Sequence, residues 1–430
     1  MPDRLPASLR AWRGLAAAAR PLTPLLLGQR ARRGREDVAR LAERRGESRL
    51  PRPEGPLVWT HGASIGEMMA IIPLVERICA RGFNVLVTSG TVTSAGLAEQ
   101  RLPPGAVHQY LPLDVPRYVA RFLDHWKPGL ALIAESDLWP NLIVQSAARG
   151  IPLVLVNGRL SQRSFDRWRR APKTIAAVLE RFDLCLAQSV ADSERYSHLG
   201  APRVSMTGNL KLDVPAPPAD AERLAEMQDA VDRRPIIIAA STHPGEEAGV
   251  IEAHRRLRQS FAGLLTIVVP RHPGRGPGVL DIANVAGLQA EMRSRGYLPG
   301  YHTEIYIADT IGELGVMYRL TPIVFMGGSL VRHGGQNPIE AAKLGAAILH
   351  GPHVWNFADI YSALDNAHGA EQVADADALT MHLGAWLNDP GLQDTIADAA
   401  LQTVGMLGGA LDRTLAAIDP YLMQLRLEHR

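Results

Sequence analysis

Residues 321–357 read TPIVFMGGSLVRHGGQNPIEAAKLGAAILHGPHVWNF, and this stretch decides the fold. The apolar run Ile323–Met326 is typical of a buried strand, and it ends at a glycine-rich turn, residues 327–329. Further on, Asn337 and Pro338 are the residue types preferred at the N-cap and first position of a helix. A glycine-rich loop between a buried strand and a helix N-terminus exposes N–H groups and suits a phosphate. The spacing matches neither a Walker loop nor a clean dinucleotide fingerprint.

The same residues admit a plainer interpretation. Glycines also serve ordinary turns, and Glu340 at the third helical position can close a capping box with Asn337. The local pattern leaves the phosphate site and the simple turn as equal alternatives.

Short apolar runs alternate with helical stretches along the whole chain, which predicts an α/β architecture. The runs fall into two sets of five, each spread over about 150 residues. The expected strands are Leu57–Trp59, Asn84–Thr88, Leu130–Ala134, Leu153–Val156, Leu184–Ala187, Ile236–Ala239, Leu264–Val269, Glu304–Ile307, Ile323–Phe325 and Ala347–Leu349.

A proline-rich stretch, DVPAPPAD at Asp213–Asp220, separates the two sets and is typical of an interdomain linker. Two parallel-sheet domains joined by a hinge predict a cleft between them, with ligands at the carboxyl ends of the strands. The expected domains are 1–50, 51–212 and 223–430, with 213–222 as linker and a last helix that packs back.

The charge is distributed unevenly. Residues 1–50 hold twelve Arg, no Lys and five acidic residues, a net +7, so the other residues carry −5 of the total +2. A basic end on a near-neutral body indicates attraction to an anionic partner. Anionic lipid is the first candidate and nucleic acid the second, although the lone aromatic Trp12 argues against base stacking. A solvated basic helix is the plainer alternative.

Neither a disulfide nor a membrane span is expected. Cys79 and Cys185 are the only cysteines, both lie in apolar contexts, and the absence of a C-x-x-C motif fits a reducing cytoplasm. Leu15–Leu27 is apolar but interrupted by Arg20 and two prolines, so it is too short to span a bilayer and is able to lie on its surface.

Ser64-Ile65-Gly66-Glu67, which follows the first expected strand, matches the S-x-x-E capping box. Capping is one interpretation of Glu67. The other is a general base, because a carboxylate at a helix N-terminus and the mouth of a cleft can accept a proton.

Polar loops follow several other expected strands. Glu135 and Asp137 after the third strand are able to bind a metal, orient hydroxyls or cap a helix, and Lys211 and Arg271 are candidate partners of an anion. No His/Cys/Asp cluster has metal-ligand spacing, so no metal or other cofactor is expected. Several such loops on one edge of two sheets favour a site.

These motifs together resemble the transferases of 3-deoxy-D-manno-octulosonic acid (Kdo) in lipopolysaccharide synthesis. The resemblance is carried, in order from residue 59 to 357, by HGASIGE, ESDLWPN, GNLKLD, STHPGEE, PRHPGR, DTIGELG, GGSLVRHGGQNPIEAAKLG and GPHVWNF. It implies a GT-B fold, two Rossmann-like domains that face each other across a cleft. It also implies CMP-Kdo as donor, a lipid A precursor as acceptor, and the cytoplasmic face of the bacterial inner membrane as location.

The resemblance also implies roles for individual residues. Glu67 matches the catalytic base, and Glu135 and Lys211 match positions that support the transition state. Segments that hold the CMP moiety match Pro270, Arg271, Ile311, Gly312, Glu313, Asn337, Pro338, Ile339 and Glu340. Further substrate or phosphate contacts are expected from Ser64, Gly66, His272, Gly327, Gly328 and Ser329.

The sequence departs from the family pattern in three places. Asp137 stands where a Glu is frequent, Ile65 stands where a Val is frequent, and an Arg-rich, Pro-broken segment replaces a continuous apolar anchor. Membrane attachment is therefore expected to be peripheral. The rivals are a transferase of another nucleotide sugar, a sugar-phosphate epimerase of the same layout, and a non-catalytic nucleotide-binding or scaffold protein.

Overall fold

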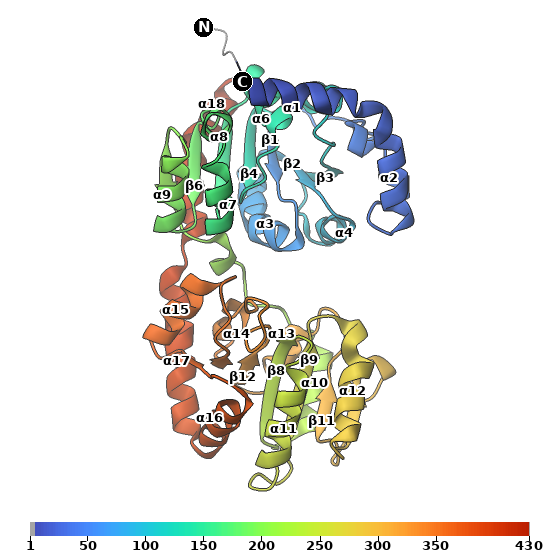
Figure 1. The fold of residues 1–430 in the computed structure, drawn as a ribbon, viewed down its shortest axis with the longest axis vertical. Coiled ribbons are helices and arrows are strands. Elements are labelled where there is room, and N and C mark those ends of the chain that lie inside the picture. Colours follow the sequence, from blue (N-terminus) through green and yellow to red (C-terminus); the bar gives the residue numbers. More distant parts are fainter. Residues whose placement is uncertain (1–4, 430) are drawn as a thin grey trace. The chain divides into compact units, whose positions relative to one another are not determined.

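The computed structural model of the chain describes residues 5–429, which divide into two compact units. The first unit contains the residues up to Val214 and those from Gly408 onward, and the second runs from Pro215 to Leu407 (Figure 1). The chain therefore passes from one unit to the other within the proline-rich stretch. It returns to the first unit for its last helix, so the second unit is shorter than the expected 223–430 domain.

The first unit is built on a parallel sheet with strand order β3-β2-β1-β4-β5-β6-β7. Its strands are β1 (Leu57–His61), β2 (Asn84–Ser89), β3 (Ala106–Tyr110), β4 (Leu130–Ala134), β5 (Leu153–Gly158), β6 (Leu184–Ala187) and β7 (Val204–Met206). Its helices are α1 (Ala7–Ala18), α2 (Thr23–Arg32), α3 (Ile65–Ala80), α4 (Val92–Arg101), α5 (Pro116–Trp126), α6 (Pro140–Ala148), α7 (Gln162–Trp168), α8 (Pro172–Leu179), α9 (Val190–His198) and α18 (Ala410–Leu427).

The second unit repeats this plan with the order β10-β11-β9-β8-β12-β13-β14, again all parallel. Its strands are β8 (Ile236–Thr242), β9 (Leu265–Pro270), β10 (Ala290–Met292), β11 (Ile305–Ile307), β12 (Ile323–Met326), β13 (Ala347–His350) and β14 (Ala370–Gln372). Its helices are α10 (Ala221–Val231), α11 (Glu247–Leu257), α12 (Gly276–Val285), α13 (Leu314–Met317), α14 (Ile339–Lys343), α15 (Ala358–Asn366), α16 (Ala376–Asn388) and α17 (Pro390–Leu407).

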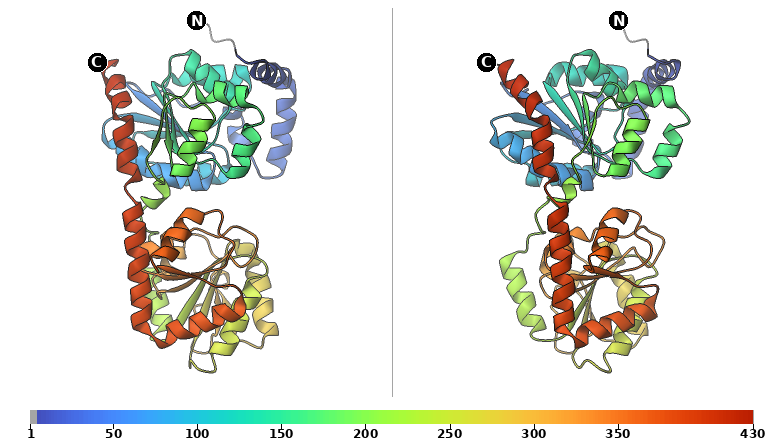
Figure 2. Two further views of the ribbon diagram at one scale, coloured as in Figure 1. Left: turned by 60° about the vertical axis from the view of Figure 1, so that its left-hand side comes forward. Right: turned by 90° about the vertical axis from the view of Figure 1, so that its left-hand side faces the viewer.

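Both faces of the first sheet are buried, because each strand alternates its side chains between two helical layers. Trp59 packs with Phe122 of α5 on one face, whereas the neighbouring Val58 faces the layer that contains α3. Helix α18 completes that second layer, and Figure 2 shows it lying along this unit. Burial of Ile418 and Leu425 against the sheet explains why the last segment belongs to the first unit.

Each sheet has one point where the strand order reverses, and this point positions the site. In the first sheet the chain goes from β1 to β2 on one side and places β4 on the other. In the second sheet β8 lies in the same way between β9 and β12. Ligands of open α/β sheets bind outside the carboxyl ends of strands at such a point, so a ligand site is expected at the loops that follow these six strands.

The N-terminal basic segment is partly built into the first unit. The buried carboxylate of Glu36 accepts hydrogen bonds from Arg30 at 2.6 Å and Arg44 at 2.9 Å, and Arg44 also donates to the carbonyl of Leu111 at 2.7 Å. The part of residues 1–50 around Arg44 therefore does not form a separate arm. Among residues 5–429, every helix falls short of the length or apolarity needed to cross a bilayer.

Candidate active site

The first unit presents Glu67 at the carboxyl end of β1. Ser64 is the N-cap of α3, and its hydroxyl oxygen accepts a hydrogen bond from the Glu67 amide at 3.3 Å. The Glu67 carboxylate turns back over the loop, where it accepts from the Ala63 amide at 2.7 Å and the Ser64 hydroxyl at 3.0 Å. The capping interaction is therefore present, and the same interactions fix the carboxylate at the end of β1.

The surroundings of Glu67 make its carboxylate a stronger base than an exposed one. Burial raises the pKa of Glu67, and the negative charges of Glu135 and Asp137 raise it further. The hydrogen bonds from Ala63 and Ser64 oppose the shift without cancelling it. A carboxylate with a raised pKa accepts a proton more readily near neutral pH, which is the property a general base needs.

Glu135 begins the loop after β4 and pairs with a lysine from a distant part of the chain. Its carboxylate lies 2.8 Å from the Lys211 ammonium, and both side chains are mostly buried. Glu135 has a φ of +56°, a strained value for a residue that is not glycine, and the Tyr196 hydroxyl donates to its carbonyl at 3.1 Å. A side-chain carbon added at Gly66 would come within 4.0 Å of Lys211 Nζ. Gly66 therefore lies beside this ion pair, at a distance where a larger side chain would make only an ordinary contact with Lys211.

His61 and Thr88, neither of which received a role from the sequence, support the loop that follows β4. His61, fully buried at the end of β1, bonds to the Asp137 carboxylate at 2.9 Å and to the Thr88 hydroxyl at 2.9 Å. Burial would raise the pKa of Asp137, but the hydrogen bond and charge of His61 outweigh it and hold that pKa below its usual value. Asp137 is therefore engaged by a histidine, and within residues 5–429 no three His, Cys, Asp or Glu side chains are arranged so that they could hold a metal ion.

The second unit presents Arg271 at the carboxyl end of β9. Its amide donates to the carbonyl of Thr242 at 3.0 Å, which joins the loops after β9 and β8. Its side chain is exposed and, within residues 5–429, forms no hydrogen bond or ion pair. Burial raises the pKa of Glu340, and the positive charge of Arg271 lowers it, so these two side chains share one electrostatic environment.

The glycine-rich turn after β12 is already occupied by a protein carboxylate. Glu246, which is 1% exposed, accepts hydrogen bonds from the amides of Gly328 at 2.7 Å, Ser329 at 2.9 Å and Leu330 at 2.9 Å. The Gly327 amide donates to the carbonyl of Ala240 at 2.8 Å. The expectation that Gly327, Gly328 and Ser329 offer free N–H groups to a phosphate is therefore wrong for this structure.

The helix after this turn begins one residue later than the sequence indicates. Helix α14 holds five residues and has Pro338 as its N-cap, while the Asn337 side chain accepts from the Ile339 amide at 3.1 Å. Among residues 5–429, Glu340 makes no capping bond to Asn337. The Glu340 side chain is therefore not used by the helix start that the plainer interpretation assigned to it.

The loop after β11 carries Ile311, Gly312 and Glu313. The Glu313 carboxylate is buried between Arg293 at 2.8 Å and Arg223 at 3.2 Å, and the hydrogen bond from Arg293 lowers its pKa to about 2. Glu313, its two arginines and Ile311 line a cavity of about 620 Å³, and Ile311 is 88% exposed. Because the Glu313 side chain is taken by arginines, the groups this loop can offer to a ligand are the exposed backbone and the Ile311 side chain.

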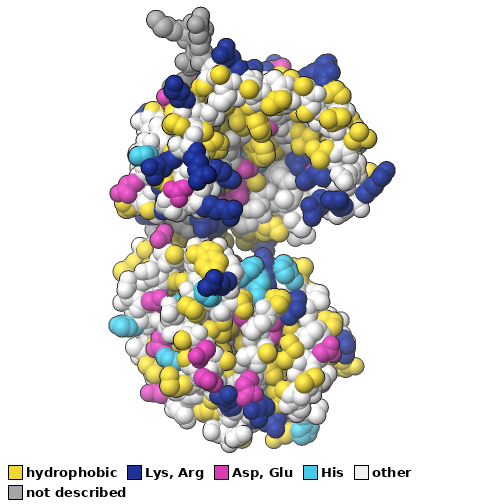
Figure 3. Space-filling model, in the orientation of Figure 1, with side chains coloured by type: hydrophobic (Ala, Val, Ile, Leu, Met, Phe, Trp, Pro, Cys, Tyr) yellow, Lys and Arg dark blue, Asp and Glu magenta, His cyan; other side chains and the backbone are white. Residues whose placement is uncertain are grey.

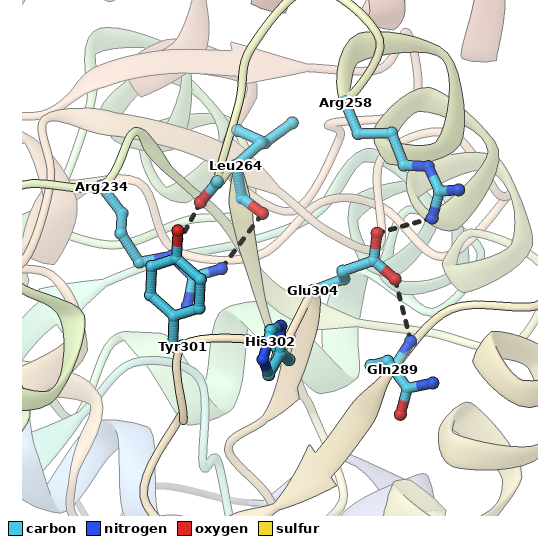
Figure 4. Close-up of a pocket in the computed structure, with 8 residues that line it drawn as sticks. Arg234, Arg258, Leu264, Gln289, Tyr301, His302 and Glu304 are labelled. Carbon is cyan, nitrogen blue, oxygen red and sulfur yellow. Dashed lines mark hydrogen bonds and ion pairs between the residues drawn. The ribbon is translucent and has the colours of Figure 1, made fainter.

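A pocket of about 720 Å³ lies at the amino ends of the strands of the second sheet (Figure 4). Its lining residues come just before β8, β9, β10 and β11 in the chain. Arg234 is clamped by backbone carbonyls, including those of Gly263 at 2.7 Å and Leu264 at 3.4 Å, and Glu304 binds Arg258 and the Gln289 amide. These side chains join loops at the amino ends of the strands, away from the edge where open α/β sheets bind ligands.

The sequence of this chain is similar to that of known proteins along most of its length. A sequence profile of the family described as 3-deoxy-D-manno-octulosonic-acid transferase (kdotransferase) matches residues 39–214. The 3-deoxy-D-manno-octulosonic acid transferase of Haemophilus influenzae is 36% identical, over 89% of this chain and 91% of that protein.

Two solved structures share the fold at low identity. A glycosyltransferase from Rickettsia africae superposes with a TM-score of 0.60 at 12% identity, over 86% of this chain and 99% of that one. A putative UDP-N-acetylglucosamine 2-epimerase from Listeria monocytogenes gives 0.59 at 16% identity, over 86% and 97%. These confirm the GT-B type of architecture expected from the sequence, two Rossmann-like units. The shared fold does not distinguish a transferase from an epimerase. The 36% identity to a transferase does make that distinction.

Proposed function

This chain belongs to the 3-deoxy-D-manno-octulosonic acid (Kdo) transferases, and we propose that it moves Kdo from CMP-Kdo to a lipid A precursor with inversion at the anomeric carbon. It is a glycosyltransferase of lipopolysaccharide synthesis by that membership. The donor, the acceptor lipid IVA and the stereochemical course are the parts we propose. The single observation that carries the mechanism is the half-buried carboxylate of Glu67, which the Ala63 amide and the Ser64 hydroxyl hold at the carboxyl end of β1, where the charge of Glu135 helps to raise its pKa.

Glu67 is the proposed general base. The acceptor hydroxyl loses its proton to Glu67 as its oxygen attacks the anomeric carbon of Kdo, and CMP leaves from the opposite face. One displacement of this kind inverts the anomeric centre. Ser64 and Gly66 are proposed contacts of the acceptor hydroxyl, because the Ser64 hydroxyl already donates to the Glu67 carboxylate and Gly66 lies in the same exposed helix start.

The leaving phosphate needs positive charge that is in place before the reaction. Arg271 is the proposed main contact, because its guanidinium has no partner within the described residues and is exposed at the carboxyl end of β9. Lys211 is the proposed second source of positive charge, held in position by Glu135. The amides of the turn after β12 take no part, since Glu246 occupies them.

The CMP moiety is proposed to rest on three loops of the second unit. Pro270 and Arg271 contribute at β9, Ile311–Glu313 at β11, and Asn337–Glu340 at the start of α14. Glu340 is the proposed partner of the ribose hydroxyls, because no capping bond uses its carboxylate. The first unit then takes the acceptor, and the second takes the donor.

The acceptor is a lipid, and we propose that helices α1 and α2 hold the enzyme against the cytoplasmic face of the inner membrane. Trp12, Leu15 and Leu25 are among their exposed apolar side chains, Leu15 and Leu25 at 69% and 73%. Figure 3 shows hydrophobic and basic side chains interspersed over this part of the first unit. Apolar side chains flanked by arginines suit insertion among anionic headgroups.

The test is an assay of the purified protein with CMP-Kdo, generated in situ, and a tetra-acylated lipid A precursor, read by mass spectrometry. The expected result is a mass gain of one or more Kdo units, which Glu67→Ala lowers by at least ~10²-fold while the variant still folds. A parallel assay with a UDP-sugar is expected to give no product. A folded, CMP-binding protein that forms no product would move the function to another donor or acceptor.

A further inference from the structure

Three histidines gather at the carboxyl ends of three neighbouring strands of the second unit. His243 follows β8, His272 follows β9, and His333 lies in the loop after β12. The His243 and His333 rings stack with centroids 3.7 Å apart, and His272 meets His243 edge-on at 6.2 Å. Figure 3 shows histidine and basic side chains together on one face of this unit. Only His272 has been given a role so far.

These rings offer hydrogen-bond donors that the described residues do not use. The Gln336 amide nitrogen lies 2.8 Å from His243 Nε2, and when it donates there, Nδ1 of the neutral ring carries the proton. Within residues 5–429, His243 Nδ1 and both ring nitrogens of His272 and His333 make no hydrogen bond. Arg271, beside His272 in the chain, has an unpartnered guanidinium as well. The group is thus rich in donors.

The chemistry of the proposed donor says what such a group can recognise. Kdo is an ulosonic acid, so its anomeric carbon carries a carboxylate as well as the bond to the CMP phosphate. The donor therefore presents two anions one carbon apart, whereas ordinary nucleotide sugars present only the phosphate. A site that takes the phosphate on Arg271 must place the carboxylate within a few ångströms of it. Arg271 is adjacent in the chain to His272, and its charge is near enough to His243 to help lower the pKa of that ring.

We propose that His272 and His333, supported by His243, bind the sugar carboxylate of the donor and thereby select ulosonic acids. This rests on the proposed function, and it adds the feature of the donor that the second unit recognises.

The groups around His243 fit this role. Burial lowers the pKa of His243, and the nearby His333, His272 and Arg271 lower it further, while Glu246 opposes them. The buried ring therefore stays neutral near neutral pH and serves as a platform for the exposed ring of His333. Glu246 also accepts a hydrogen bond from the His243 amide at 2.9 Å, so the platform and the turn after β12 are anchored by one carboxylate.

The experiment compares the binding of CMP with the use of CMP-Kdo. The variants are His272→Asn and His333→Asn, both at exposed positions, and the matched control is His302→Asn, an exposed histidine at the opposite edge of the same sheet. The expected result is a KM for CMP-Kdo raised about 10-fold or more, the scale of a lost hydrogen bond to a charged group. The dissociation constant of CMP and the control variant are expected to change less than about 2-fold.

Each other outcome overturns the proposal in a different way. Equal losses of CMP and CMP-Kdo binding would place the histidines on the phosphate, and unchanged KM values would remove them from the donor site. Failure of the wild-type protein to use CMP-Kdo while it binds CMP would overturn the proposed function and this inference together. That failure appears in the wild-type arm, so it is distinct from the other two.

Discussion

The ammonium of Lys211 lies 2.8 Å from the carboxylate of Glu135, although 75 residues separate them in the chain. The pair sits at the carboxyl end of β4, and the Glu135 charge is one of the causes that raise the pKa of Glu67. Lys211 therefore partly compensates a charge that acts directly on the proposed base. Loss of either partner changes the electrostatics of Glu67.

We predict that Lys211→Met lowers kcat by about 10²-fold, because it removes one of the two proposed positive charges for the leaving phosphate. Steady-state rates with CMP-Kdo and the lipid acceptor measure this. Lys173→Met, at an exposed lysine of the same unit, is the control and should keep the wild-type rate. A Lys211→Met enzyme as fast as the control would limit this ion pair to a structural role.

The pH dependence of kcat/KM should show the raised pKa of Glu67. A base works only when deprotonated, so activity is expected to fall as the pH drops through a value above the ordinary pKa of a glutamate. Glu135→Gln removes one negative charge that raises this pKa, so the acidic limb should move to lower pH. An acidic limb that stays in place would mean that another group controls it.

The sequence predicts the interior of both sheets and misses their edges. All ten expected strands are present, and the four that were missed, β3, β7, β10 and β14, are the outermost strands of the two sheets. Interior strands of a parallel sheet are buried on both faces and read as continuous apolar runs. Edge strands such as Ala290–Met292 and Ala370–Gln372 are short and partly polar, so their pattern does not differ from that of a loop.

The site shows a similar limit. Glu67, Glu135 and Lys211 were identified through motifs, but pairing across 75 residues depends on the topology. Glu246 was quoted in a motif and received no role, because nothing local indicates that a carboxylate will reach the amides of a turn more than 80 residues later. The glycines that suggested a phosphate loop do form a turn after β12. The amides of this turn, however, donate to the carboxylate of Glu246.

We predict that Glu246→Gln destabilises the second unit. The amide has one oxygen where the carboxylate has two, and its NH₂ group would face amide donors. The expected loss in the free energy of unfolding is roughly 3 kcal/mol, the scale for buried hydrogen bonds to a charged group. Chemical denaturation measures it, and Glu252→Gln on the exposed side of α11 is the control. Equal stability of the two variants would show that the turn holds its shape without Glu246.

Turnover is expected to persist in EDTA. In the proposed mechanism Arg271 and Lys211 supply the positive charge at the leaving phosphate, so no divalent cation is required. The measurement is the initial rate after dialysis against EDTA, with the CMP-Kdo supply treated separately so that a metal-dependent coupling enzyme does not limit it. Loss of activity that Mg²⁺ restores would contradict the prediction and assign part of the charge to a metal.

The last prediction concerns the exposed surface of α1, α2 and the 3₁₀ turn between them, Arg20–Leu22. Leu22→Asp with Leu25→Asp should weaken binding to vesicles of phosphatidylglycerol and phosphatidylethanolamine by about 10²-fold or more. Each leucine loses burial worth roughly 1.5–3 kcal/mol, and each added carboxylate is repelled by the anionic surface. Both leucines are more than 60% exposed, so the fold should tolerate the change. The control is Leu427→Asp, a 68% exposed leucine at the end of α18. If both proteins bind vesicles equally well, α1 and α2 are not the membrane-binding surface, and the lipid acceptor must reach Glu67 without help from this face.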